Sequence, residues 1–248
     1  MLPLPPDDPQ GGARSEPALC SLDAFDGTLA QRTYQSLREA ILSLELRPGH
    51  ALRKPEICDA LGVSRSPVSE AMARLSGEGL VDIVPQAGTF VARLSMAEIQ
   101  EGAFLREAIE LAAIERVATD ISEEQLVPLR RGLRIQDALI EDEDFAGFYK
   151  QDAEMHGLIL SYTGFRNLAA VSETAWVQVN RARQLVLPVP GRVSETLEEH
   201  RAVIAALEAR DPEKARQALR HHLRQLMTFL TPLEREHPDL FQPRPRPR

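Results

Sequence analysis

The sequence has little of what marks a secreted or membrane protein. It holds only two cysteines, Cys20 and Cys58, in unrelated surroundings, which argues against a disulfide framework. Its amino terminus, MLPLPPDDPQ, lacks the basic and apolar regions of a secretory signal, and no apolar run approaches the ~20 residues of a membrane span. We therefore expect a cytoplasmic protein without a membrane partner.

Aromatic residues are also scarce, at 5% of the chain, whereas Ala, Leu, Glu and Arg fill long stretches and favour helix. The formal net charge of −8 argues against a uniformly basic surface that would coat nucleic acid. A local basic site stays open, because basic and acidic side chains nearly balance between residues 28 and 95. At 248 residues, the chain has room for one large domain or two modest ones.

The pattern of apolar and helix-ending residues divides the chain into four parts. Residues 1–27 are rich in Pro, Gly and Asp, and residues 235–248 end in FQPRPRPR, so we expect both segments to be disordered. Residues 28–93 predict three helices followed by a two-stranded hairpin. Residues 94–234 contain no convincing strand and predict an all-helical domain, with one continuous helix over residues 166–187.

The third predicted helix begins with an unusual turn, Ser64-Arg65-Ser66-Pro67, ahead of an apolar series at helical spacing. Three helices followed by a hairpin are the order of a winged helix-turn-helix, whose third helix points its first turn into the major groove of DNA. There Arg65 could bond guanine O6 and N7, and the hydroxyls and free N–H groups would suit phosphates. The alternative is that Ser64 only caps the helix and that Arg65 is only a solvated charge.

Three segments, LREAILSLELRPGHAL, LGVSRSPVSEAMARLSGEGLV and PQAGTFV, together resemble the DNA-binding domain of GntR-family transcription regulators over about residues 30–93. The resemblance implies a double-stranded DNA operator as the partner. Ser69 stands where many relatives have Arg, and Ala87 stands where the wing is often basic, so other basic residues are expected to compensate. The expected DNA-binding residues are Arg53, Lys54, Ser64, Arg65, Ser66, Pro67, Ser69, Arg74, Gln86 and Gly88.

In the helical part, four residues of metal-ligating type fall on the apolar faces of three predicted helices. Asp152 and His156 are four residues apart and share an inward face, while His200 and His222 lie among the apolar residues of their own helices. His221 falls among polar residues instead. Each His alone could be a hydrogen-bonded core residue, but a buried Asp without a partner is strongly disfavoured. One Asp and three His that converge in a bundle would form a natural metal site.

The segments DAEMH, EEHRAVIAALEARDPEKA and HHL extend the resemblance to the metal-containing branch of the FadR subfamily, with an FCD-type ligand-binding domain, over about residues 96–231. This implies that Asp152, His156, His200 and His222 bind a divalent metal, zinc or nickel or else manganese, beside a small carboxylate effector. It also implies a homodimer on a near-palindromic operator, with repression as the expected effect. For Arg106, an exposed ion pair with Glu110 is an alternative. The expected effector-binding residues are Arg106, Arg181 and Arg183.

Two other functions stay open at this point. A site of three His and one Asp with free coordination positions could activate water, and the chain would then be a helical metalloenzyme acting on a small organic acid. The sequence has no His-Glu-x-x-His motif and no obvious Glu base beside the ligands, so we expect no enzyme. A structural zinc domain would require a closed site. The fold class expected from all these features is mainly α, an N-terminal winged helix-turn-helix followed by an all-α helical bundle.

Overall fold

The computed structural model describes residues 19–243, except for the side chains of residues 169, 170, 173 and 174. Within this range the chain forms two compact units. The winged unit consists of residues 19–96 and 234–243, and the helical unit consists of residues 97–233. None of the described helices combines the length and the apolar character that crossing a membrane requires.

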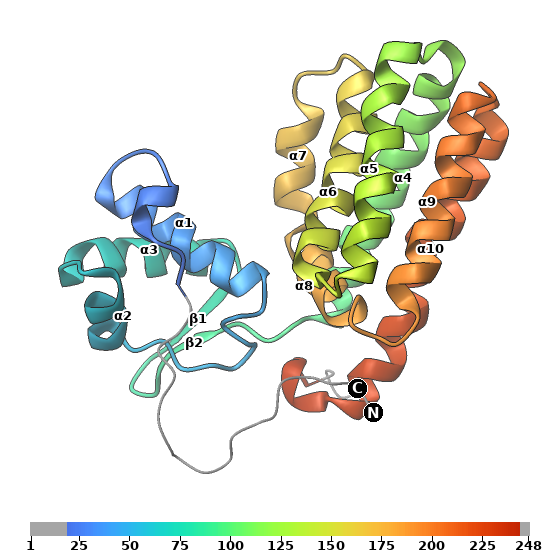
Figure 1. Cartoon of the computed structure of the whole chain (residues 1–248). Coiled ribbons are helices and arrows are strands. Elements are labelled where there is room, and N and C mark those ends of the chain that lie inside the picture. Colours follow the sequence, from blue (N-terminus) through green and yellow to red (C-terminus); the bar gives the residue numbers. More distant parts are fainter. Residues whose placement is uncertain (1–18, 244–248) are drawn as a thin grey trace. The chain divides into compact units, whose positions relative to one another are not determined.

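Three helices followed by a hairpin make up most of the winged unit, as the sequence predicts (Figure 1). The elements are α1 (Leu29–Leu42), α2 (Lys54–Leu61), α3 (Arg65–Gly77), β1 (Val81–Val84) and β2 (Gly88–Val91). Thr28 and Gln31 form a reciprocal capping box at the start of α1. Gly62 ends α2 with a φ of 64°, a left-handed conformation that glycine adopts without strain, and this permits the tight turn into α3.

One face of α3 packs on α1 and leaves the first turn of α3 exposed. Val68, Met72 and Leu75 of α3 are at most 1% exposed, and Leu37 and Ile41 of α1 are fully buried. Burying each such side chain stabilises the fold by roughly 1.5–3 kcal/mol. The apolar series predicted from the sequence is therefore the part of α3 that fixes its position.

The strands β1 and β2 form an antiparallel hairpin that projects as the wing. Val81 lies opposite Val91, and Val84 lies opposite Gly88. The turn between them includes Gln86 in a left-handed conformation, with a φ of 63°. The residues of this turn are exposed, so the tip of the wing is open to a partner.

Two segments predicted to be disordered contain regular structure, which corrects that prediction. Residues 19–27 include a 3-10 turn, and the Ser36 hydroxyl donates to the Cys20 carbonyl at 2.7 Å. Residues 235–243 include the end of a helix and a further 3-10 turn, and Phe241 is only 3% exposed. Composition averages over a segment, whereas one or two well-placed apolar side chains suffice to dock it. The remainder of both segments, residues 1–18 and 244–248, lies outside the described residues.

The helical unit is a bundle, and residues 97–233 contain no strand. Its helices are α4 (Met96–Asp120), α5 (Glu123–Glu141), α6 (Phe145–Tyr162), α7 (Leu168–Ala175), α8 (Val177–Val186), α9 (Arg192–Glu208) and α10 (Pro212–Glu236). α4, α5, α6, α9 and α10 run alongside one another (Figure 1) and share one apolar core. Each of these five helices contributes a side chain that is at most 2% exposed: Ile114, Leu129, Ile159, Ile204 and Leu219.

The single helix predicted over residues 166–187 is wrong, because the chain breaks it into α7 and α8 at Trp176. The backbone of Trp176 leaves the helical conformation, with φ −106° and ψ 9°. Its side chain is 7% exposed, and the Arg106 guanidinium lies 5.4 Å from the centre of one of its rings. Tertiary packing of this large side chain thus overrides a local sequence that favours uninterrupted helix.

Candidate functional site

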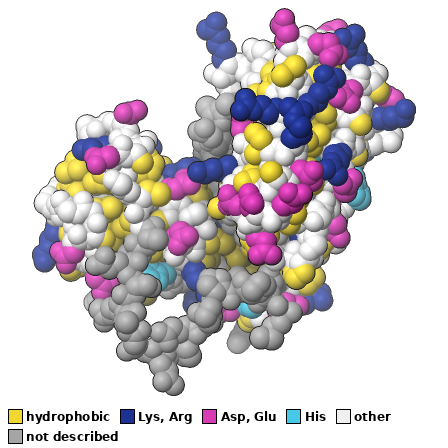
Figure 2. All heavy atoms as spheres, viewed as in Figure 1, with side chains coloured by type: hydrophobic (Ala, Val, Ile, Leu, Met, Phe, Trp, Pro, Cys, Tyr) yellow, Lys and Arg dark blue, Asp and Glu magenta, His cyan; other side chains and the backbone are white. Residues whose placement is uncertain are grey.

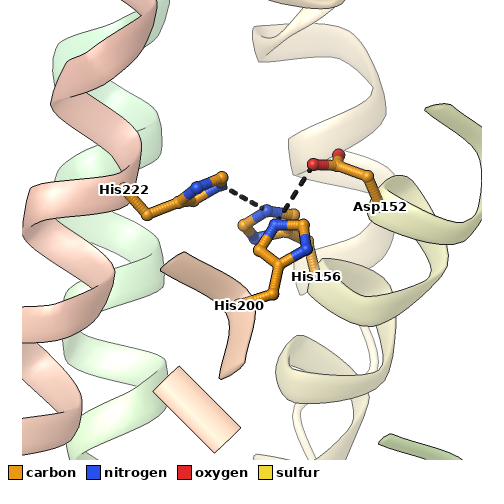
Figure 3. Close-up of side chains that lie close together, drawn as sticks. All are labelled: Asp152, His156, His200 and His222. Carbon is orange, nitrogen blue, oxygen red and sulfur yellow. Dashed lines mark hydrogen bonds and ion pairs between the residues drawn. The ribbon is translucent and has the colours of Figure 1, made fainter. Parts of the chain in front are cut away.

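The four residues predicted as metal ligands meet inside the helical bundle (Figure 3). Asp152 and His156 come from adjacent turns of α6, His200 from α9 and His222 from α10. Each can offer one ligand atom, and these atoms all lie within 4.8 Å of one another. All four side chains are buried. Packing of three helices therefore brings together residues that are up to 70 positions apart in the chain.

A hydrogen bond at Nδ1 fixes the orientation of each imidazole ring. The three bonds join His156 to Glu110 Oε2 at 2.5 Å, His200 to Gln136 Oε1 at 2.8 Å and His222 to Glu199 Oε2 at 2.7 Å. Carboxylate and amide oxygens only accept hydrogen bonds, so Nδ1 carries the proton in all three rings. Each Nε2 is left with a lone pair, and these lone pairs are directed into the centre of the site.

Without a cation, the groups at this centre repel one another. Nε2 of His156 lies 3.1 Å from Nε2 of His222, and Nε2 of His200 lies 3.3 Å from Oδ1 of Asp152. None of these atoms has a proton to donate, and Nε2 of His200 has no hydrogen-bond partner in the described part of the chain. A buried polar atom without a partner costs about 1–3 kcal/mol. Three imidazole nitrogens and a carboxylate oxygen therefore have the chemistry of a metal-binding donor set.

Burial keeps the three imidazoles in the neutral form that metal binding needs. It lowers the pKa of His200 and His222 well below the usual value of 6.5. Burial also lowers the pKa of His156, although the neighbouring Glu110 opposes the shift. Burial alone would raise the pKa of Glu110, but the charge of Arg106 and the hydrogen bonds from Arg106 and His156 bring it below its usual range. At neutral pH the site thus combines neutral rings with the ionised carboxylate of Glu110.

Buried arginines hold both outer carboxylates, those of Glu110 and Glu199, in place. Arg106 Nε donates to Glu110 Oε1 at 2.6 Å, and Arg192 donates from both terminal nitrogens to the two oxygens of Glu199, each at 2.7 Å. Arg106 is 4% exposed and Glu110 is 1% exposed. Arg106 and Glu110 therefore form the ion pair that the alternative predicted, but the pair is buried in the core and not exposed.

A small cavity of about 30 Å³ borders the donor set. Three arginines, Arg106, Arg183 and Arg192, contribute to its lining together with Asp152 and His222. Arg183 also forms an ion pair with Asp152. Burial lowers the pKa of the Arg183 guanidinium to about 10, so this group stays cationic at neutral pH. The cavity thus presents positive charge beside the donor set.

The arginines that line the cavity are not the same three that the sequence predicted for effector binding. Arg181 is fully buried, donates to Gln178 Oε1 at 3.2 Å and does not line the cavity. Arg192, Gln136 and Glu199 also belong to the site and were not predicted from the sequence. One signal for Gln136 was present, because it follows Leu129 and Leu133 on the inward face of α5, where a polar residue needs a partner. Glu199 and Arg192 could have been recognised only by their seven-residue spacing on α9.

In the winged unit, the first turn of α3 is exposed and has groups available for a ligand. Ser64 occupies the N-cap position, but its side chain makes no capping hydrogen bond. This finding disfavours the alternative in which Ser64 serves only as a cap. Arg65 is the first helical residue, is exposed and has no ion pair within residues 19–243. Ser66 is also exposed, whereas Pro67 and Ser69 are half-buried.

The other predicted DNA-binding residues fall into two groups. Gln86 is exposed in the turn of the wing, Gly88 is exposed at the start of β2, and Lys54 is exposed in the first turn of α2. Arg53 instead pairs with a neighbouring glutamate at 3.0 Å. Arg74 stacks on Tyr34, with its guanidinium carbon 3.7 Å from the ring centre, and pairs with a glutamate at 3.4 Å. Arg53 and Arg74 therefore have partners within the protein, which weakens the expectation that they replace missing phosphate contacts.

The surface charge is mixed. Figure 2 shows acidic and basic side chains interspersed over the visible face of the helical unit. Such a mixed surface is consistent with a formal net charge of only −8 over 248 residues. Attraction of a polyanion would therefore depend on local groups such as those at the start of α3.

Comparisons with known proteins agree with both units. Residues 29–91 match the family described as bacterial regulatory proteins, gntR family, and residues 101–225 match the FCD domain. A transcriptional regulator encoded in an unstable DNA locus of Streptomyces ambofaciens is 33% identical over 84% of this chain and 87% of its own length. The transcriptional repressor RspR of Escherichia coli is 30% identical over 85% of this chain and 92% of its own length.

Solved structures share the fold. McbR/YncC of E. coli superposes with a TM-score of 0.71 at 22% identity, covering 84% of this chain and 99% of the other. A GntR transcriptional regulator from Rhodococcus superposes with a TM-score of 0.69 at 25% identity, covering 82% and 97%. With a winged helix-turn-helix followed by a helical ligand-binding domain, the chain belongs to the GntR family of bacterial transcriptional regulators that carry an FCD domain, and it is a ligand-responsive DNA-binding regulator rather than an enzyme.

Proposed function

We propose that this regulator is a metal-dependent repressor of the FadR subfamily, which senses a small dicarboxylate and binds a near-palindromic operator as a homodimer. The observation that carries the metal part is the common orientation of the three imidazole rings. All three Nε2 lone pairs face one another and the Asp152 carboxylate, with no proton between them. A cation at this point would give each of these lone pairs a partner.

Asp152, His156, His200 and His222 would hold the ion. Three imidazole ligands favour zinc or nickel, whereas manganese would prefer more oxygen ligands. The outer residues Glu110, Gln136 and Glu199 would keep the rings in the binding tautomer, the role that outer hydrogen-bond partners play in metal sites generally. When bound, the metal supplies positive charge that attracts an anion to the cavity.

The balance of buried charge supports a dianionic effector. Three carboxylates, those of Asp152, Glu110 and Glu199, face three guanidinium groups, those of Arg106, Arg183 and Arg192. The histidines are neutral, so this cluster carries no net charge until a divalent ion adds two positive charges. Burying uncompensated charge is strongly disfavoured. A dicarboxylate would restore neutrality, whereas a monocarboxylate would leave one charge uncompensated.

We propose that Arg183 is the first residue to move when the metal binds. Its guanidinium pairs with Asp152, the only carboxylate of the donor set. A metal ion at Asp152 would repel this guanidinium, which would then be free to turn toward the effector. Arg106 and Arg192 line the same cavity but hold Glu110 and Glu199, so they would contribute charge without leaving their partners. Arg181 has no place in this proposal because it does not line the cavity.

For DNA, we propose that the exposed turn at Ser64, Arg65 and Ser66 contacts the operator, with Arg65 reading a base. The sugar-phosphate backbone of the DNA would be contacted by Gln86, Gly88 and Lys54. Pro67 and Ser69, which are half-buried, would contact it at closer range. Smaller contributions are expected from Arg53 and Arg74. A regulator with one reading helix per chain gains both affinity and specificity by binding two half-sites as a symmetric dimer. RspR, a relative of 30% identity, is named a repressor, and this supports repression over activation.

The metal proposal is tested by the metal content of purified variants. Wild-type protein should carry about one equivalent of zinc or nickel per chain, and chelation should lower its Tm, because the metal binds only the folded site. His200→Ala and His222→Ala should lose the metal. His221→Ala is the matched control, because His221 lies next to His222 but is exposed. A protein that loses its metal through His221→Ala and keeps it without His222 would overturn the assignment.

The effector proposal is tested with two acids of equal chain length. Succinate carries two carboxylates and butyrate carries one, so a neutralising dianion should raise the Tm of the zinc-loaded protein more than the monoanion does. Arg183→Met should abolish the succinate shift and retain the zinc. Equal shifts with both acids would contradict the charge argument and indicate that the site recognises one carboxylate group and ignores the second.

A further inference from the structure

The last described residues form a clip on the segment that follows the wing. The Leu94 N–H donates to the Leu240 carbonyl at 3.0 Å, and the Gln242 N–H donates to the Leu94 carbonyl at 2.8 Å. Leu94 and Phe241 thereby pair as a parallel β-bridge. Residues 93–95 and 237–242 all lie in the winged unit, so the clip is internal to that unit. These two paired segments, residues 93–95 and 237–242, are the clip.

Side chains close the clip on both sides of this pairing. Arg93 Nε donates to the Asp239 carbonyl at 2.8 Å. Leu94 is 0%, Leu240 is 5% and Phe241 is 3% exposed, so three apolar side chains are withdrawn from water together. Two backbone hydrogen bonds combined with apolar burial make a specific attachment, in contrast to a chain end that merely lies on a surface.

The clip joins two long helices of the chain. α4 begins at Met96, two residues after Leu94, and α10 ends at Glu236, shortly before the docked segment. The chain passes between the winged and helical units after Met96 and again between Leu233 and Glu234. Both passages therefore begin next to the clip. The matches to the gntR family and the FCD domain end at residues 91 and 225, so neither match includes the clip.

The same two helices contribute to the candidate metal site. α4 provides Glu110, which bonds the Nδ1 of His156, and α10 provides His222. Each of these positions is about 14 residues from the clip end of its helix, or roughly 21 Å at ~1.5 Å per residue. α10 also contains Pro232, one residue before the boundary between the units. A proline inside a helix removes a backbone hydrogen bond and is a common point of bending.

We propose that the clip is the device that carries the state of the metal site to the DNA-binding helices. It makes the end of α10 part of the winged unit, so a shift of α10 relative to α4 at the site acts on Leu94. Leu94 lies three residues after the end of β2, and the N–H of the intervening Ala92 donates to the Leu80 carbonyl at the base of the wing. Two units joined by a single linker are expected to move independently, and a second attachment restricts that motion. The inference rests on the proposed metal-dependent function.

The test compares two truncations and one point variant of the full-length regulator. Removal of residues 237–248 deletes the clip, Phe241→Ala weakens it, and removal of residues 244–248 leaves it intact while deleting the same basic RPRPR end. Hydrogen exchange of the Leu94 amide reports whether the clip is closed, because its partner is the Leu240 carbonyl. Metal content and operator affinity are measured for each protein, with zinc alone and after chelation.

The clip variants should exchange the Leu94 amide at least about tenfold faster and keep their metal content. Their operator affinity without metal should stay within about twofold of wild type, but the change in affinity on zinc loading should fall toward none. The protein lacking residues 244–248 should behave as wild type. A clip variant with fast Leu94 exchange and the full wild-type response to zinc would overturn the inference. A wild-type protein whose operator affinity ignores zinc would overturn the metal-dependent function as well.

Discussion

The role of Gln136 offers the sharpest test of the metal site, because this residue touches one ligand and binds no metal itself. Gln136 is fully buried, and its Oε1 accepts the Nδ1 proton of His200 at 2.8 Å. Gln136→Leu keeps the volume of the side chain and removes the acceptor. The His200 ring can then adopt its other tautomer and donate from Nε2 to Asp152 Oδ1, which lies 3.3 Å away.

This tautomer blocks the nitrogen that the metal needs. Loss of an outer hydrogen-bond partner generally costs 10- to 100-fold in metal affinity, which corresponds to about 1.4–2.7 kcal/mol. The metal-free protein should lose little stability, since the new His200–Asp152 hydrogen bond replaces the one that was removed. Zinc affinity falls while metal-free stability holds, and this combination separates a tautomer effect from simple damage to the core.

The affinity is measured by competition with a chromophoric chelator, and the stability of the metal-free protein by urea unfolding. Gln136→Glu restores an acceptor and should recover most of the affinity. Gln217→Leu is the control for the chemical change, because Gln217 is exposed on α10 and bonds only a neighbouring glutamate in the described structure. The reasoning would be refuted by a Gln136→Leu protein that binds zinc as tightly as wild type.

Two further predictions concern the DNA contact and pH. Arg65→Ala should weaken operator binding by about 1–3 kcal/mol and relax the preference at one base pair per half-site in gel-shift assays, whereas equal weakening on random DNA would leave only a phosphate contact. The metal-free protein should lose stability as the pH falls below 6.5, because burial lowers the pKa of His200 and His222 and the unfolded chain takes up protons that the folded chain does not. Each of these histidines contributes up to about 1.4 kcal/mol per pH unit, so urea unfolding free energies that stay constant between pH 7.5 and 5.5 would contradict the assigned burial.

The local pattern of the sequence was sufficient for the three helices and the hairpin of the winged unit. The capping residue Thr28, the left-handed Gly62 and the apolar series Val68, Met72 and Leu75 act over a few residues. Their effects can therefore be predicted from residue type and spacing alone. The same holds for the inward position of the four predicted ligands, since helical periodicity alone assigns each of them to an apolar face.

Local pattern was misleading where a single tertiary contact decides the outcome. The helix predicted over residues 166–187 breaks because Trp176 packs into the core. Residues 237–242 look like the start of a polar tail, yet Phe241 docks on Leu94, almost 150 positions away. Composition and periodicity average over neighbours in the chain, so they carry no information about a partner that arrives from a distant segment.

The candidate site shows the same division. The sequence by itself determined that one aspartate and three histidines face the interior, because their periodicity is a property of each helix separately. Only the tertiary structure decided that their ligand atoms lie within 4.8 Å of one another and that Gln136 and Glu199 orient the rings. It also placed Arg192 beside the cavity and left Arg181 away from it. These outcomes depend on how several helices rotate and pack against one another, and that information is shared among distant residues of the chain.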